Sequence, residues 1–255
     1  MRTWRKNGGV WEQVDSLPLA DRGFRYGMSV FETVAVVAGR PLLLEAHLER
    51  LQRAARDCGA EWTGFPDFDF ATIGTGLVRF YLTAGPGAPC DAFAGNAYAL
   101  FDEAEVGWNL PALRVASSAA PYLPRPGGWK TGNYWQNIDA MGHARRAGCD
   151  EALVFNPAGM LVGAAMANVF LEIDGSWVTP ALETGARDGV VRSWVLRNFG
   201  ADEGILEVRD VARCKAAFLT NSRMGIRAVG ELDGRPLIDA VSDFRQKYFD
   251  DIFSA

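Results

Sequence analysis

A segment dense in proline and glycine, residues 122–128 (YLPRPGG), most limits the folds open to this chain of 255 residues. Proline fixes its backbone and lacks an amide proton, and glycine weakens helices and strands, so no regular element is expected to run through it. We therefore predict a linker at 122–128. A smaller N-terminal domain would occupy residues 1–121 and a larger C-terminal domain residues 129–255.

Both parts of the chain combine strand-like and helix-like patterns. Residues 24–44 carry aromatic and β-branched side chains around a turn at Ala38-Gly39, which predicts a β-hairpin, and residues 44–58 have apolar side chains at helical spacing. Elsewhere we expect strands at 78–83, 97–101, 113–118, 151–155, 216–220 and 225–232, and helices at 134–147, 189–199 and 241–253. A long apolar stretch at 160–173 ends in a hairpin turn at Asp174-Gly175, before residues 176–179. This mixture predicts an α+β fold.

Composition argues against several classes of protein. The net charge is −5 and the basic residues are scattered, which disfavours nucleic-acid binding, and no apolar run is long enough to predict a membrane span. Two histidines give little basis for a metal centre or a histidine-based triad, so we expect no metal. The four cysteines are widely spaced without a CxxC pair, which favours a reducing, cytoplasmic setting.

Two segments of the N-terminal part carry candidate functional residues. Residues 21–33 read DRGFRYGMSVFET, and residues 47–50 read HLER. An arginine on the side of a helix, such as Arg50, is usually solvated, but guanidinium is also the preferred bidentate partner of phosphate. Arg50 is therefore a candidate anion ligand.

Lys130 opens a third segment, KTGNY at residues 130–134, and GCDEAL follows at residues 148–153. A lysine amine can condense with an aldehyde and then move a proton of the bound substrate. Lys130 is therefore the candidate catalytic residue.

Two segments of the C-terminal part are candidate anion ligands. Residues 189–192 (GVVR) open an expected helix, where the unpaired N–H groups of Val190 and Val191 and the helix dipole favour an anion such as phosphate. Residues 220–226 (TNSRMGI) add the polar side chains of Asn221 and Ser222.

In this order, the segments resemble those of the class IV aminotransferase superfamily. These fold-type IV enzymes use pyridoxal 5′-phosphate (PLP) and include branched-chain and D-amino-acid aminotransferases and aminodeoxychorismate lyases. The resemblance implies a smaller N-terminal α/β domain and a larger C-terminal domain with a mixed, barrel-like sheet. It also implies a homodimer with PLP between the domains and a small amino acid or keto acid as substrate.

The resemblance assigns roles to individual residues. Lys130 would be the Schiff-base lysine, and Arg50 and the start of the helix at residue 189 would hold the cofactor phosphate. The positions expected at the cofactor are Arg50, Tyr134, Gly163, Val190, Val191, Asn221 and Ser222. The positions expected at the substrate are Tyr26, Arg25 and Arg223, and Arg227 is a further candidate for its carboxylate.

Gly163 marks a departure from the family pattern. The family has a glutamate there, which hydrogen-bonds the pyridine nitrogen and keeps PLP a strong electron sink. A charge-assisted hydrogen bond contributes roughly 1.5–3 kcal/mol, so its loss would slow catalysis about 10- to 100-fold or more. Thr83-Ala84-Gly85 also lacks the arginine that often binds a substrate carboxylate in the family.

Three hypotheses remain open. In the first, the chain is an active PLP enzyme, either an aminotransferase or an aminodeoxychorismate lyase-like enzyme. In the second, it is a weakened or non-catalytic homologue that binds PLP or a related phosphate ligand. In the third, the altered site at the ring nitrogen supports a different reaction. Within the first hypothesis, the segment TNSRMGI favours the lyase branch, whereas the abundance of transaminases in the superfamily favours the aminotransferase branch.

Overall fold

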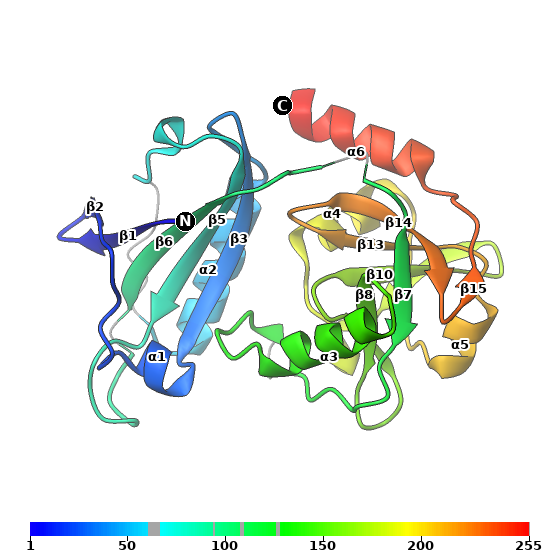
Figure 1. Cartoon of the computed structure of the whole chain (residues 1–255), viewed down its shortest axis with the longest axis horizontal. Helices are drawn as coiled ribbons and strands as arrows, with labels where there is room; N and C mark the ends of the chain where they lie inside the picture. Colours follow the sequence, from blue (N-terminus) through cyan, green and yellow to red (C-terminus); the bar gives the residue numbers. More distant parts are fainter. Residues whose placement is uncertain (61–66, 94, 108–109, 126–127, 255) are drawn as a thin grey trace. The chain divides into compact units, whose positions relative to one another are not determined.

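The computed structural model describes residues 1–60, 67–93, 95–107, 110–125 and 128–254, so residues 126–127 of the predicted linker lie outside the described residues. Contacts divide the chain into two compact units, which are coloured along the sequence in Figure 1. Unit 1 comprises Met1–Val106 and Trp129–Asn133, and unit 2 comprises Gly107–Gly128 and Tyr134–Ala255.

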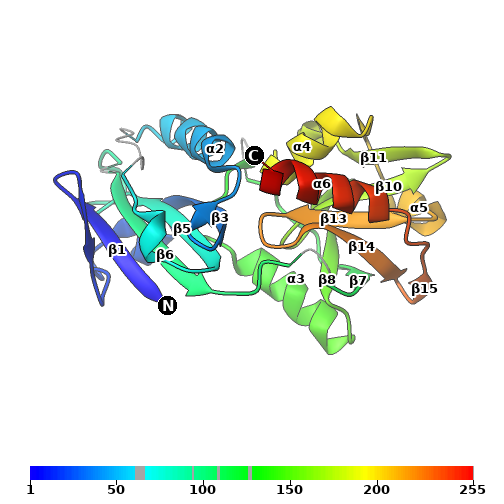
Figure 2. The same cartoon turned by 90° about the horizontal axis from the view of Figure 1, so that it is seen from above.

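Unit 1 is built on a six-stranded antiparallel sheet. Its strands lie in the order β2 (Val10–Gln13), β1 (Arg2–Asn7), β6 (Asn96–Glu103), β5 (Gly76–Thr83), β3 (Ser29–Val37) and β4 (Arg40–Pro41). Helix α2 (Leu44–Asp57) lies along one face of this sheet (Figure 2) and buries Leu51, Ala54 and Ala55 in the core. The helix expected at 44–58 and the strands expected at 78–83 and 97–101 are confirmed.

The strand expected from residue 24 begins only at Ser29, because residues Arg22–Tyr26 form the short helix α1. The Gly23 N–H donates to the Asp21 carboxylate at 2.7 Å, which caps the start of α1. Gly27 ends the helix in the left-handed conformation, with φ of 67°. Local capping therefore outweighs the strand pattern of these aromatic residues.

Unit 2 contains a nine-stranded mixed sheet. Its order is β12 (Asp202–Gly204), β11 (Ser176–Pro180), β10 (Asn168–Ile173), β13 (Ala217–Asn221), β14 (Gly225–Leu232), β7 (Leu113–Ser117), β8 (Glu151–Phe155) and β9 (Leu161–Ala164), with β15 (Arg235–Pro236) beside β14. The helices of this unit are α3 (Trp135–Arg146), α4 (Val190–Asn198), α5 (Val208–Arg213) and α6 (Ser242–Ser254). The α+β fold expected from the sequence is confirmed.

The boundary between the units differs from the predicted boundary. Strand β7, which falls in the expected N-terminal domain of residues 1–121, belongs to unit 2 because it pairs in parallel with both β8 and β14. Residues Trp129–Asn133 belong to unit 1 instead, because the Phe31 N–H donates to the Lys130 carbonyl at 2.8 Å and the Gly132 N–H to the Ser29 carbonyl at 3.0 Å. Pairing between distant segments thus sets the boundary.

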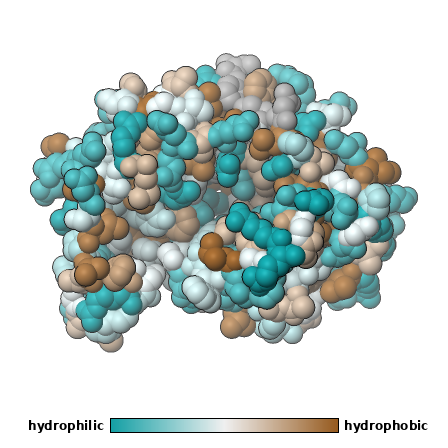
Figure 3. All heavy atoms as spheres, in the orientation of Figure 1, coloured by the Kyte–Doolittle hydropathy of each residue, from teal (hydrophilic) through white to brown (hydrophobic). Residues whose placement is uncertain are grey.

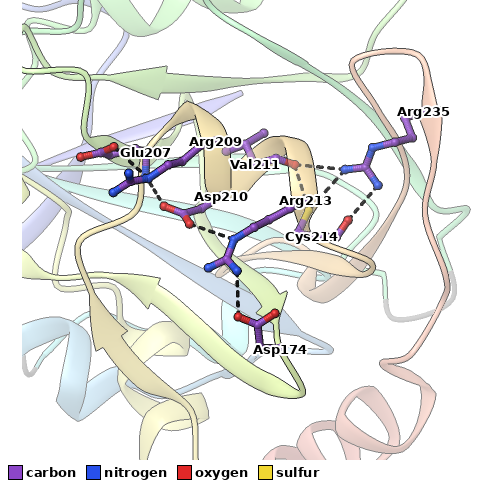
Figure 4. A network of polar contacts seen from close by, with 8 residues as sticks. All are labelled: Asp174, Glu207, Arg209, Asp210, Val211, Arg213, Cys214 and Arg235. Carbon is purple, nitrogen blue, oxygen red and sulfur yellow. Dashed lines mark hydrogen bonds and ion pairs between the residues drawn. The ribbon is translucent and has the colours of Figure 1, made fainter.

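Helix α5 is fixed by polar contacts, which Figure 4 shows among Asp174, Glu207, Arg209, Asp210, Val211, Arg213, Cys214 and Arg235. Glu207 and Asp210 form a reciprocal capping box at the start of the helix. Beyond its end, Arg235 donates to the carbonyl oxygen of Cys214 at 2.7 Å. Burial raises the pKa of the Cys214 thiol, so this cysteine is a structural residue rather than a nucleophile.

The surface mixes polar and apolar residues, as the face drawn in Figure 3 shows. Some large apolar side chains are nevertheless well exposed, including Phe24 (68%) of unit 1 and Trp135 (79%) of unit 2. Among the described residues, no helix is both long and apolar enough to cross a membrane.

Candidate active site

Lys130 lies in unit 1, on a segment that pairs with strand β3. Thr131 and Val30 form an antiparallel bridge, and the flanking backbone hydrogen bonds of Lys130 and Gly132 hold this segment against the strand. The Lys130 Nζ lies 3.8 Å from the centroid of the Phe31 ring. The structure therefore brings two sequence-predicted segments together, DRGFRYGMSVFET and KTGNY.

A buried cluster of charged and polar side chains, Glu32, His47 and Arg50, occupies the same unit. The Arg50 Nε donates to Glu32 Oε1 at 2.6 Å, and a terminal nitrogen of Arg50 donates to Glu32 Oε2 at 2.6 Å. Burial alone would raise the pKa of Glu32, but the charge of Arg50 and the hydrogen bonds from His47 and Arg50 outweigh burial and lower it. Arg50, which was expected at the phosphate, is thus held by a bidentate pair with Glu32.

His47 completes this cluster with its Nδ1 at 2.8 Å from Glu32 Oε2. Burial lowers the pKa of His47, and although the hydrogen bond to Glu32 opposes this, the positive charges of Arg50 and Lys130 lower it further. The imidazole is therefore neutral at pH 7, and its Nδ1–H donates to Glu32. Arg50 and Lys130 both act electrostatically on His47, which links these two predicted residues within unit 1.

The arginine of the DRG segment shapes a loop. The Arg22 guanidinium is buried and donates to five carbonyl oxygens, those of Ala84, Gly85, Ala88, Asp91 and Ala92. Its neighbour Asp21 accepts a hydrogen bond from the Thr83 hydroxyl at 2.7 Å. These contacts account for Asp21 and Arg22 as structural residues.

The two predicted substrate residues of unit 1 lie on α1 and contact each other. The guanidinium carbon of Arg25 is 4.8 Å from the centroid of the Tyr26 ring, and Tyr26 is 45% exposed. In unit 2, Arg223 is exposed in the turn that follows β13. Arg227 donates its Nε–H to the Pro111 carbonyl at 2.7 Å, so that donor is already engaged.

The start of helix α4 is buried but uncapped. Gly189 is the N-cap and provides no side-chain hydrogen bond, and Val190 and Val191 are only 8% and 2% exposed. The first N–H groups of a helix have no partner within the helix, so these buried donors suit an anionic ligand. A side chain at Gly189 would collide with the Asn168 amide, so this approach requires glycine.

Asn221 stabilises the turn after β13 and the turn between β9 and β10. Its Nδ2 donates to the Met166 carbonyl at 3.2 Å, and its Oδ1 accepts from the Arg223 N–H at 3.0 Å. Ser222 is half-buried beside it. The adjacent Thr220 hydroxyl is buried without a hydrogen-bond partner among the described residues, so it is available to a ligand.

Gly163 lies in β9 opposite Val154 of β8, with φ of 156°. Glu151, at the start of β8, was not predicted as a site residue. Its carboxylate accepts the Ala152 N–H at 2.9 Å and is also hydrogen-bonded by the backbone of residues 165–166, just after Gly163. Burial raises the pKa of Glu151 to about 7. A buried carboxyl group therefore lies at the turn that follows β9, where backbone N–H groups already donate to it.

Tyr134 contacts a second residue that was not predicted, Arg187. A terminal nitrogen of Arg187 (Nη1) donates to the Tyr134 hydroxyl at 2.6 Å, and the guanidinium carbon lies 5.6 Å from the centroid of the Tyr134 ring. The Arg187 Nε is buried and has no hydrogen-bond partner within the described part of the chain. Arg187 lies two residues before the segment GVVR, outside the motif, so the motif did not point to it.

The predicted residues thus divide between the two units. Unit 1 contains Arg25, Tyr26, Arg50 and Lys130, and unit 2 contains Tyr134, Gly163, Val190, Val191, Asn221, Ser222 and Arg223. Unit 1 supplies an amine and a fixed guanidinium. Unit 2 supplies buried hydrogen-bond donors that suit an anion.

Comparison with known proteins identifies the family of this chain. Residues 29–232 match the family model of amino-transferase class IV. The chain is 28% identical over 246 residues to an aminodeoxychorismate lyase of Bacillus subtilis, and the match covers 86% of this chain and 83% of that protein.

Solved structures share the fold at lower identity. A branched-chain aminotransferase of Thermoproteus uzoniensis with norvaline has a TM-score of 0.86 at 20% identity, covering 100% of this chain and 95% of that one. A hypothetical aminotransferase of Mycobacterium tuberculosis in its PLP-bound form has a TM-score of 0.81 at 23% identity, covering 100% and 99%. Because the family match spans more than half of its residues, the chain belongs to the amino-transferase class IV family.

Proposed function

We propose that this protein is a PLP-dependent enzyme that transfers the amino group of a small amino acid or cleaves an amino-substituted acid, with Lys130 as its catalytic residue. The observation that carries the proposal is the pairing of the Lys130 segment with β3. This pairing fixes the backbone of the lysine, and the Phe31 ring 3.8 Å from Nζ restricts where its amine can lie.

Pyridoxal 5′-phosphate is the cofactor of this family, and the chain's own residues fit it. The buried, uncapped start of α4 and the unpartnered Thr220 hydroxyl suit its phosphate. Arg50, Tyr134, Asn221 and Ser222 are the further residues proposed to hold it. When bound, PLP supplies an electron sink for the charge that develops at the substrate α-carbon.

Each proposed residue has a separate task. Lys130 holds the cofactor through Nζ and moves the proton at the substrate α-carbon. Arg50 presents a guanidinium that Glu32 keeps in one orientation, so little conformational entropy is lost when an anion binds. Gly163 supplies no side chain to the cofactor ring, so the electron sink is weaker than that of relatives with a glutamate there.

Product analysis tests this proposal. PLP-loaded protein is incubated with a panel of amino acids and keto acids, and separately with aminodeoxychorismate, and the products are identified by mass spectrometry. New amino and keto acid pairs indicate transamination, whereas cleavage of aminodeoxychorismate indicates lyase chemistry. We expect Lys130→Ala to abolish either reaction, and equal activity in Lys130→Ala would refute the proposal.

We further propose a homodimer. Support comes from the sequence resemblance to fold-type IV enzymes, which implies a homodimer, and the exposed side chains of Phe24 and Trp135 are candidates for its contact surface. Multi-angle light scattering on the eluting protein should give twice the mass of one chain. The mass of a single chain at micromolar concentration would rule the dimer out.

A further inference from the structure

Arg187 differs from Arg50 and Arg192, two other shielded arginines, in having no acidic partner among the described residues, and unlike Arg22 it has no carbonyl oxygens in place of one. Arg50 pairs with Glu32, and Arg192 pairs with Glu203. The half-buried Arg187 makes no ion pair with any described residue, and its one hydrogen bond goes to a neutral phenol, that of Tyr134. An arginine that is partly removed from water without a counter-charge favours an anionic ligand.

The donors of Arg187 that remain available form one edge of the guanidinium. The Nη1 atom donates to Tyr134, whereas Nε is buried without an acceptor among the described residues. In Arg50, Nε and Nη2 form the edge of the guanidinium that binds the Glu32 carboxylate. The geometry left open at Arg187 therefore matches a carboxylate bound in a bidentate manner.

The backbone of Arg187 is fixed separately from its side chain. Its carbonyl oxygen accepts the Asn168 Nδ2–H at 2.8 Å and the Gly189 N–H at 2.9 Å. The side chain donates to the Tyr134 hydroxyl, and the backbone N–H groups at the start of α4, which suit the phosphate, are separate donors.

We infer that Arg187 binds the carboxylate of the substrate and so selects amino and keto acids over neutral amines and ketones. This inference rests on the proposed function and identifies its specificity-determining residue. It adds a further candidate for that task to those from the sequence, of which Arg25 stacks on Tyr26, Arg227 donates to the Pro111 carbonyl and Arg223 is exposed.

Isothermal titration calorimetry tests the inference without relying on turnover. Pyruvate, a minimal keto acid, and its neutral methyl ester are titrated into PLP-loaded wild-type protein and three variants. Arg187→Gln removes the charge, Arg187→Lys keeps the charge but loses the planar fork, and Arg197→Gln removes an exposed charge from α4 as the control.

We expect wild type to bind pyruvate more tightly than the ester. Arg187→Gln should raise the Kd for pyruvate at least about 10-fold, as loss of a charge-assisted bidentate contact does. The Kd of Arg187→Lys for pyruvate should lie between those of wild type and Arg187→Gln, and the Kd of Arg197→Gln should match that of wild type. Affinity for the ester and for PLP should be the same in all four proteins, and circular dichroism should show the same fold.

Two results would overturn the inference. One is an equal Kd for pyruvate in wild type and Arg187→Gln. The other is a weaker affinity of Arg187→Gln for PLP and inorganic phosphate with pyruvate unaffected, which would assign Arg187 to the phosphate. A wild type that carries no PLP on Lys130 would instead contradict the proposed function. The titrations on PLP-free protein would then decide on Arg187, and a Kd for pyruvate that does not depend on Arg187 would overturn the inference.

Discussion

At the residue scale, Glu32 is the side chain that holds both Arg50 and His47. Removing one partner of a buried ion pair costs roughly 3–5 kcal/mol, because the other charge stays buried without compensation. We therefore expect Glu32→Gln to lower the free energy of unfolding at pH 7 by about 3 kcal/mol in urea denaturation. Asp139→Asn, which removes an exposed pair with His143, should cost less than about 0.5 kcal/mol.

The pH dependence of this effect has a definite sign. The pKa of Glu32 is lowered from 4.5 in the folded state, so its ion pair stabilises the protein above pH 4.5 and this contribution is lost as the pH falls further. The stability difference between wild type and Glu32→Gln should therefore shrink in acid. A difference that stays constant down to the acid transition would contradict the role given to this carboxylate.

Glu151 predicts the opposite pH dependence. Burial raises its pKa from 4.5 to about 7, so the folded protein binds this proton more tightly than the unfolded chain. The stabilisation is complete below pH 4.5 and is lost as the pH rises through 7, a change of about 3 kcal/mol. Glu151→Gln should flatten the profile of unfolding free energy between pH 5 and 8. The exposed control Glu183→Gln should keep the wild-type profile. A wild-type profile in Glu151→Gln as well would contradict the role given to Glu151.

The effect of the missing carboxylate at Gly163 can be tested with two substitutions that cause the same backbone strain. At φ of 156°, with the position of a Cβ 3.2 Å from the Ala167 carbonyl, both Gly163→Ala and Gly163→Glu should lose about 1 kcal/mol of stability. The rate ratio of Gly163→Glu to Gly163→Ala then isolates the carboxylate. We expect about 10- to 100-fold faster transamination in Gly163→Glu. Equal rates would show that the missing carboxylate does not limit catalysis.

Candidate site residues were proposed from the sequence only where a motif contains them. Lys130 and Arg50 stand in recognisable segments. Glu32 also stands in one, DRGFRYGMSVFET, but its contact with Arg50 exists only in the folded chain, where β3 packs against α2. Arg187 was not among the sequence-based candidates. The feature that singles it out is the lack of an acidic partner, and burial and pairing can be seen only in the folded chain. Glu151 stood in a quoted segment, but its raised pKa depends on burial that the sequence does not report.

At the element scale, the start of α4 allows a backbone donor to be removed without breaking the helix. Val190 is the first helical residue, where proline is well tolerated, and Gly189 has φ of −76° and ψ of 138°, which suits a residue before proline. Val190→Pro should therefore keep α4 in circular dichroism but raise the Kd for PLP about 10-fold or more, because one N–H to the phosphate is lost.

Two controls distinguish the loss of the Val190 N–H from a change in side-chain packing. Val190→Ala shortens the side chain but keeps the N–H, so it should bind PLP more tightly than Val190→Pro does. Pyridoxal, which has no phosphate, should bind both variants equally. Equal affinity of the two variants for PLP would mean that the Val190 N–H does not contact the phosphate.

Elements with strong local periodicity were predicted well. The helix α2 and the strand β14 lie within a residue of their expected bounds, and in α2 the apolar pattern follows one buried face. The hairpin β1–β2 was missed, although the turn at Gly8 and Gly9 has φ of 54° and 92°. Both strands contain charged residues, so they lack the alternation of apolar and polar residues that predicts a strand.

At the scale of the whole molecule, the fold class followed from the sequence but the boundary between the units did not. A proline- and glycine-rich segment shows where regular structure stops, but it does not show which sheet the neighbouring residues join. Strand β7 joins unit 2 through parallel pairing with β8 and β14, and such non-local pairing leaves no short-range pattern.

The central claim is that Lys130 carries the cofactor, and borohydride reduction followed by peptide mass mapping tests it most directly. The chain has only three other lysines, Lys6, Lys215 and Lys247, so the modified position can be assigned without ambiguity. After incubation with PLP and reduction, the account predicts a stable cofactor adduct on the peptide that contains Lys130 and none in Lys130→Arg. An adduct on another lysine, or no adduct on wild-type protein, would contradict it.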